Sequence, residues 1–179
     1  MKKKTLWITE TAALLALLIA LQWVTKPLGQ LVTGACVNTV LAVSALFCGL
    51  SSGLTVALLS PLFAYFLNIA PNLIAVPVIM VGNSLFVLLL SVLSGNQIWK
   101  RILAWLVAAA AKFSAMYALI TWVICGLLAD FLLSQGILKT PMLKMLPATF
   151  SWPQLITALI GGGVALLIVP MLKKALHRV

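Results

Sequence analysis

Residues 102–128 read ILAWLVAAAAKFSAMYALITWVICGLL, a stretch in which Lys112 is the only charged side chain. A helix needs about 20 apolar residues to cross a hydrocarbon core about 30 Å thick, and this stretch is long enough. It lacks the alternation of apolar and polar residues that is typical of membrane β-strands. Residues 102–128 therefore predict a membrane-spanning helix that carries one lysine inside it.

The composition extends this prediction to the whole chain. Of 179 residues, 64% are hydrophobic and only 8% are charged, whereas about 25% are charged in soluble domains. Hydropathy and the Gly, Pro and Asn punctuation predict one transmembrane domain over residues 1–179. Its expected spans are 6–24, 35–50, 53–69, 73–94, 102–128 and 154–172. The predicted fold class is an all-α membrane protein with six transmembrane helices.

The basic residues predict an orientation for these six spans. Eight lysines and arginines fall on one side of the predicted topology, at positions 2, 3, 4, 100, 101, 173, 174 and 178. Three fall on the other side, namely Lys26, Lys139 and Lys144. By the positive-inside rule, both the N and C termini are expected to be cytoplasmic. The formal charge of +10 is thus interpreted as a topology signal rather than a nucleic-acid surface.

The predicted connections differ in length between the two sides. GLSSG at 49–53 and NIAPN at 68–72 predict tight turns. Two longer connections face outward, KPLGQLVTGA at 26–35 and SQGILKTPMLKMLPATFSW at 134–152. Long outward loops over a helical bundle are either lids for an external ligand or simple connectors.

The chain lacks the side chains of most membrane enzymes. Glu10 and Asp130 are its only acidic residues, and His177 is its only histidine. Metalloproteases, aspartyl proteases and serine hydrolases need His or carboxylate groups that this inventory does not supply, so no catalytic residue and no metal site is predicted. The sequence also has no P-loop and no mid-membrane carboxylate for ion coupling. The protein is therefore either passive or driven by another subunit.

Three polar side chains fall inside predicted spans. Lys112 lies eleven residues beyond Arg101, so it is expected roughly 16 Å into the bilayer. A lysine there is costly unless it is hydrated, paired or neutral, and Asp130 is too far along the same helix to pair with it. One interpretation is that Lys112 faces a ligand pocket. The other is that its ammonium group snorkels toward the membrane surface or packs against another subunit. Asn38 and Asn83 either contact a ligand or form hydrogen bonds between helices.

Small residues form two patterns that favour close helix packing. Ala12, Ala16 and Ala20 recur at every fourth position in the first span and therefore share one helical face. Such a face lets a second helix approach closely, either from a partner subunit or from within the same chain. The GGG run at 161–163 allows close backbone approach or bending in the sixth span.

Together these features resemble the substrate-binding S components of energy-coupling factor (ECF) transporters. The resemblance rests on the A-x-x-x-A-x-x-x-A motif, the length, the six spans and the run GQLVTGACVNTVLAVSALFCGLSSGLTVALLSPLFAYF at 29–66. It covers essentially the whole chain. It implies a non-enzymatic vitamin-binding subunit in a bacterial cell membrane. It also implies that the alanine face docks on a T component, which carries two ATP-binding subunits that power uptake.

The resemblance predicts the substrate less sharply than the family. The sequence is most similar to the cobalamin-specific branch, and pantothenate is the alternative vitamin. Both present an anionic group that Lys112 or an outer lysine can meet, whereas the outer loops lack the acidic residues expected for cationic thiamine. The candidate substrate-binding residues are Gln30, Thr33, Asn38, Asn83 and Lys112. A passive channel or structural membrane subunit is the alternative of a different class.

Overall fold

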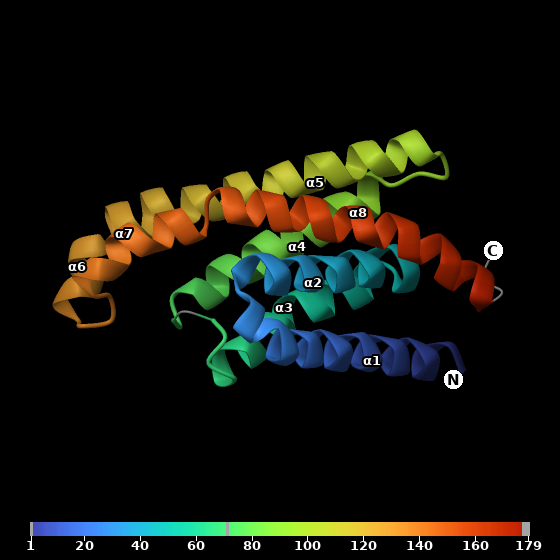
Figure 1. Ribbon diagram of the computed structural model, residues 1–179, viewed down its shortest axis with the longest axis horizontal. Coiled ribbons are helices and arrows are strands. Elements are labelled where there is room, and N and C mark those ends of the chain that lie inside the picture. The colour runs from blue at the N-terminus through green and yellow to red at the C-terminus, as the bar shows by residue number, and fades with distance from the viewer. Residues whose placement is uncertain (1, 71, 177–179) are drawn as a thin grey trace.

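The computed structural model describes residues 2–70 and 72–176, and every regular element in them is helical (Figure 1). The predicted turn residue Pro71 and the tail residues His177 and Arg178 lie outside the described residues. The elements are α1 (Lys2–Thr25), η1 (Lys26–Leu28), α2 (Gln30–Val43), η2 (Ser44–Cys48), α3 (Leu50–Phe66), α4 (Ala75–Leu93), α5 (Ile98–Ala118), η3 (Leu119–Leu127), α6 (Ala129–Ser134), α7 (Thr140–Thr149) and α8 (Trp152–Ala175).

Most of these helices are long and apolar enough to cross a membrane. Within the described residues, five segments meet that condition: Lys4–Leu28, Gln30–Cys48, Ala75–Leu93, Ile98–Leu127 and Thr140–Ala175. The remaining apolar helix, Leu50–Phe66, has 17 residues, which is the lower end of the range for a spanning helix, about 17–25 residues. The prediction of an all-α membrane protein is confirmed.

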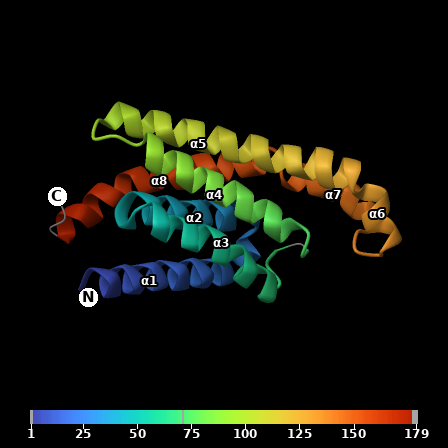
Figure 2. The same cartoon turned by 180° about the vertical axis from the view of Figure 1, so that it is seen from behind.

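The helices lie side by side along one axis, with α1 on one side of the bundle and α5 on the other (Figures 1 and 2). α2 packs most extensively against α8, and α4 packs against α3 and α5. The described ends of the chain and the connection from α4 to α5 lie at one end of the bundle, and α6 and α7 lie at the opposite end (Figure 1).

The two long connections expected on one side are largely helical. Within residues 26–35, the short η1 helix is followed by Gly29, which has a φ of 88°, and α2 begins at Gln30. Residues 134–152 contain α7, which has a proline in its first turn. The sequence predicts loops for these residues because they include polar side chains. A polar residue can nevertheless begin a helix where it faces a cavity, as Gln30 does at the start of α2.

The predicted GLSSG turn is also shorter than expected. Gly49 alone reverses the chain, with a φ of 95° that glycine adopts without strain, and α3 begins at Leu50. Asn68 has a φ of 54° just after α3 ends, within the predicted NIAPN turn. The expected second and fifth spans continue into π-helical segments, η2 and η3, which widen the helix locally.

The glycine run in α8 permits the close packing of α8 on α2. A Cβ added at Gly161 would lie 2.6 Å from both the Ala35 carbonyl oxygen and the Asn38 Cβ. A Cβ at Gly162 would collide with the indole of Trp105, whose Nε1 donates to the Ala158 carbonyl oxygen. Of the two roles predicted for GGG, close approach is the one that these contacts support.

The alanine stripe of α1 lies on the outside of the bundle. Ala12, Ala16 and Ala20 are exposed, whereas Leu18 and Gln22 of the same helix are buried. The stripe therefore does not pack against another helix of this chain, which removes internal packing as its explanation.

We expect Gly161→Ala to destabilise the protein by about 1–3 kcal/mol, because overpacking forces two helix backbones apart. Thermal unfolding of the purified protein in detergent measures this loss. Gly163→Ala is the matched control, since its Cβ would lie 3.3 Å from the edge of the Trp105 ring, which is a side chain rather than a backbone. An equal loss in both variants would contradict the account of α2–α8 packing.

Candidate substrate-binding cavity

A cavity of about 300 Å³ lies between the last turns of α1 and α3, the first turns of α2, α4 and α8, and the middle of α5. Two apolar clusters flank it along the bundle. One contains Leu41, Val56 and Phe86, and the other contains Met116, Ile120 and Phe150. Such volumes lie at the lower end of small-molecule pockets, which span about 300–1,000 Å³.

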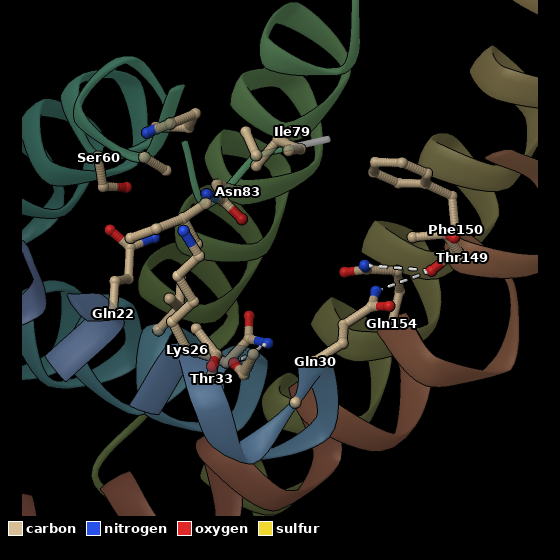
Figure 3. A pocket seen from close by; sticks show the side chains of 18 of the residues that line it. Gln22, Lys26, Gln30, Thr33, Ser60, Ile79, Asn83, Thr149, Phe150 and Gln154 are labelled. Atoms are coloured by element: carbon tan, nitrogen blue, oxygen red, sulfur yellow. Dashed lines mark hydrogen bonds between the residues drawn. The ribbon is translucent and has the colours of Figure 1, made fainter. Parts of the chain in front are cut away.

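All five sequence-predicted site residues line this one cavity. Gln30, Thr33 and Asn38 come from α2, Asn83 comes from α4, and Lys112 comes from α5. Their spacing along α2 explains part of this convergence, because Gln30 and Thr33 are three residues apart and share one helical face, and Asn38 lies about 80° around the helix from Gln30. Gln30, Thr33 and Asn83 surround the cavity in Figure 3.

Lys112 is a buried part of the cavity wall. Its side chain is 2% exposed, and its Nζ donates to Asn38 Oδ1 at 2.6 Å and to Asn83 Oδ1 at 2.7 Å. The Nζ also lies 5.6 Å from the centre of the Phe86 ring, which is within the range of a cation–π contact. Two amide dipoles and an aromatic face thus replace the water that this ammonium group has lost.

The two asparagines differ in how their amide nitrogens are used. Asn38 Nδ2 donates to the Gly34 carbonyl at 2.9 Å and to Thr157 Oγ1 at 3.2 Å, so its side chain connects α2 to α8. Asn83 Nδ2 is buried and has no partner among the described residues. A donor in that state is costly unless a ligand or water satisfies it.

Two further orphaned polar atoms belong to residues that line the cavity. Gln22 Oε1 and Ser60 Oγ are buried without a hydrogen-bond partner in the described part of the chain. Figure 3 shows Gln22, Ser60 and Asn83 gathered on one side of the cavity. Three unsatisfied groups from α1, α3 and α4 therefore converge where a polar ligand can bind.

Amide side chains close the opposite side of the cavity. Gln30 Nε2 donates to the Thr149 carbonyl at 3.0 Å, and Gln154 Nε2 donates to the same oxygen at 3.4 Å (Figure 3). Phe150, which follows Thr149, is 1% exposed and lines the cavity. These bonds hold the C-terminal end of α7 over the cavity.

The charge of the cavity wall is positive. Lys26 and Lys112 line it, and no acidic residue does so among the described residues. Nor do those residues bring three His, Cys, Asp or Glu side chains together as a metal site. The arrangement can bind a polar or anionic molecule through hydrogen bonds, and it positions no nucleophile with a general base.

Sequence reasoning did not select several lining residues: Gln22, Ser60, Thr149, Phe150 and Gln154. Gln22 could have been selected from the sequence, because an amide inside an apolar span is costly and therefore suggests a functional role. Phe150 could not have been selected from the sequence, since its burial depends on how α7 packs.

We expect Asn38→Ala to lower the free energy of unfolding by about 1–3 kcal/mol, because it removes one of the two acceptors of Lys112 and leaves buried groups unsatisfied. Thermal unfolding of the purified protein measures this change. Gln135→Ala, at an exposed amide, is the control and should be neutral. Equal stability of Asn38→Ala and the wild type would contradict the structural role of the network.

Comparison with known proteins identifies the family. The family model described as "ECF transporter, substrate-specific component" matches residues 10–173. No curated protein and no solved structure matches the chain. The match covers most of the sequence, including every residue named above as lining the cavity. The chain therefore belongs to the substrate-specific S components of ECF transporters, which are multi-pass subunits of the cell membrane that bind a transported substrate, associate with T and ATP-binding components, and are not enzymes.

Proposed function

We propose that the substrate is a small vitamin with an anionic group, of the size of pantothenate, and that it binds in the cavity around Lys112. The main support for this proposal is the buried ammonium group of Lys112. It is held by Asn38 and Asn83, and no carboxylate among the described residues lines the cavity. A lysine donates three hydrogen bonds, of which these two amides accept two. A substrate carboxylate supplies both a third acceptor and the missing negative charge.

The remaining polar groups suit the rest of such a molecule. Gln22 Oε1 accepts a hydrogen bond from a hydroxyl or amide of the substrate, and Asn83 Nδ2 donates one. Ile79 and Phe150 supply apolar contact area in the same cavity. Pantothenate carries a carboxylate, an amide and hydroxyl groups on a short chain.

Cobalamin is the second candidate, and the sequence resemblance favours it. Its phosphate is anionic, but its corrin ring system is far larger than pantothenate. A cavity of about 300 Å³ does not enclose it. Cobalamin binding therefore requires the Gln30–Thr149 contact to open and α7 to move away from α2.

A binding screen tests the substrate proposal. Purified protein is titrated with pantothenate, cyanocobalamin and thiamine by isothermal calorimetry. We expect pantothenate to bind and thiamine not to bind, because a cation meets two lysines and no carboxylate. Lys112→Met should weaken binding by about 10-fold to 100-fold, since hydrogen bonds to charged groups contribute about 1.5–3 kcal/mol.

Lys144→Met is the matched control, because Lys144 is exposed and does not line the cavity. Tight cobalamin binding would replace pantothenate with the second candidate. Thiamine binding, or unchanged affinity in Lys112→Met, would contradict an anion site at Lys112.

We also propose that the cavity opens toward the outside and that the alanine stripe docks on the T component. The orientation rests on the excess of basic residues at the end of the bundle where the described chain ends lie. The docking role rests on exposure, because Ala12, Ala16 and Ala20 present small side chains along the outside of α1. A second helix can approach such a surface closely within the membrane.

We expect Ala16→Trp to abolish vitamin uptake in cells that co-express the T component and both ATPases, while the purified subunit keeps its vitamin affinity. Leu17→Trp is the control, since Leu17 is 49% exposed and lies about 100° from Ala16 around the same helix. Loss of affinity in the purified Ala16→Trp subunit would contradict docking as the role of the stripe.

A further inference from the structure

A second cavity, of about 180 Å³, lies at the other end of the bundle from the substrate cavity. It is formed where η2, the end of α4, the start of α5 and the end of α8 meet. Its polar and charged lining side chains are Ser91, Ser94, Asn96, Arg101 and Lys173. None of these residues takes part in the substrate site.

Two cations line this cavity. Arg101 Nε donates to the Gly95 carbonyl at 3.0 Å, which holds the guanidinium against the turn between α4 and α5. Lys173 reaches the cavity from the last turns of α8. No acidic side chain lines the cavity in the described part of the chain. The two positive charges therefore have no protein counter-charge in the cavity lining and favour an anionic ligand.

Two hydroxyl groups beside the cations are also unsatisfied. Ser91 Oγ and Ser94 Oγ are buried atoms with no hydrogen-bond partner among the described residues. A guanidinium, an ammonium and two hydroxyl donors around one small cavity match the several oxygens of a phosphate group.

The surroundings of the cavity are apolar and exposed. Val92 and Leu93, between the two serines, are 65% and 45% exposed, and Met171, close to Lys173 in α8, is 70% exposed. In a membrane these side chains meet acyl chains. We propose that this cavity binds the phosphate of an anionic phospholipid headgroup, with Arg101 and Lys173 as its cations and Ser91 and Ser94 as hydrogen-bond donors. Basic pockets between transmembrane helices are known to hold acidic lipid headgroups.

The lipid site is independent of the proposed substrate. Its test is native mass spectrometry of the delipidated full chain, titrated with phosphatidylglycerol or phosphatidylcholine in detergent. Phosphatidylglycerol should bind at least about 10-fold more tightly, because the choline cation of the other lipid is repelled by Arg101 and Lys173. Equal binding of the two lipids would overturn the proposal.

Variants separate this cavity from general surface charge. Lys173→Gln and the double variant Ser91→Ala, Ser94→Ala should each reduce phosphatidylglycerol affinity several-fold. The neighbouring Lys174→Gln should not, because Lys174 is exposed and does not line the cavity. These variants spare the bond between Arg101 and Gly95 and are expected to fold. Equal loss in Lys174→Gln, or no loss in the other two, would overturn the proposal.

Inorganic phosphate and glycerol 3-phosphate identify the source of the phosphate. Neither should displace phosphatidylglycerol at millimolar concentration, since neither makes the apolar contacts of the acyl chains. Displacement by either compound would overturn the assignment to a lipid and show that the cavity takes a soluble phosphate.

Discussion

The buried ammonium group of Lys112 is the constraint on which the arrangement of this bundle depends. A lysine in the middle of a membrane helix costs about 2.5–3.5 kcal/mol on insertion scales. The protein offsets this cost with the amide oxygens of Asn38 and Asn83, at 2.6 and 2.7 Å. Because these residues belong to α2, α4 and α5, one polar contact joins three helices from distant parts of the sequence.

The packing around this network determines how accurately it is placed. Gly161 lets α8 approach α2 at the level of Asn38, and Thr157 of α8 accepts a hydrogen bond from the Asn38 amide. Asn38 can therefore direct only its oxygen at Lys112. Asn83 has no such partner for its nitrogen in the described part of the chain and keeps an unused donor at the cavity. Among the described residues, the Asn38 amide is fully bonded within the protein, whereas the unused Asn83 donor faces the cavity that is proposed to bind the substrate.

Sequence reasoning identified the polar centre but not the walls of the cavity. Lys112, Asn38 and Asn83 stood out because polar side chains are expensive inside apolar spans, and the structure brings them into contact. Gln30 was chosen as part of an expected loop, yet it begins α2 and binds the Thr149 carbonyl. Hydropathy does not detect α7, since its helix is short and partly polar. The positions of Phe150 and Ser60 in the cavity wall depend on tertiary packing, which cannot be predicted from single residues within apolar runs.

The most direct test of the account is the position of the bound vitamin, measured in a crystal structure of the chain with the vitamin that it binds most tightly. The account predicts an anionic oxygen of the vitamin about 3 Å from Lys112 Nζ, with Asn38 and Asn83 still bonded to the same ammonium group. A vitamin bound outside this cavity, or one that places an apolar group against Lys112, would contradict it.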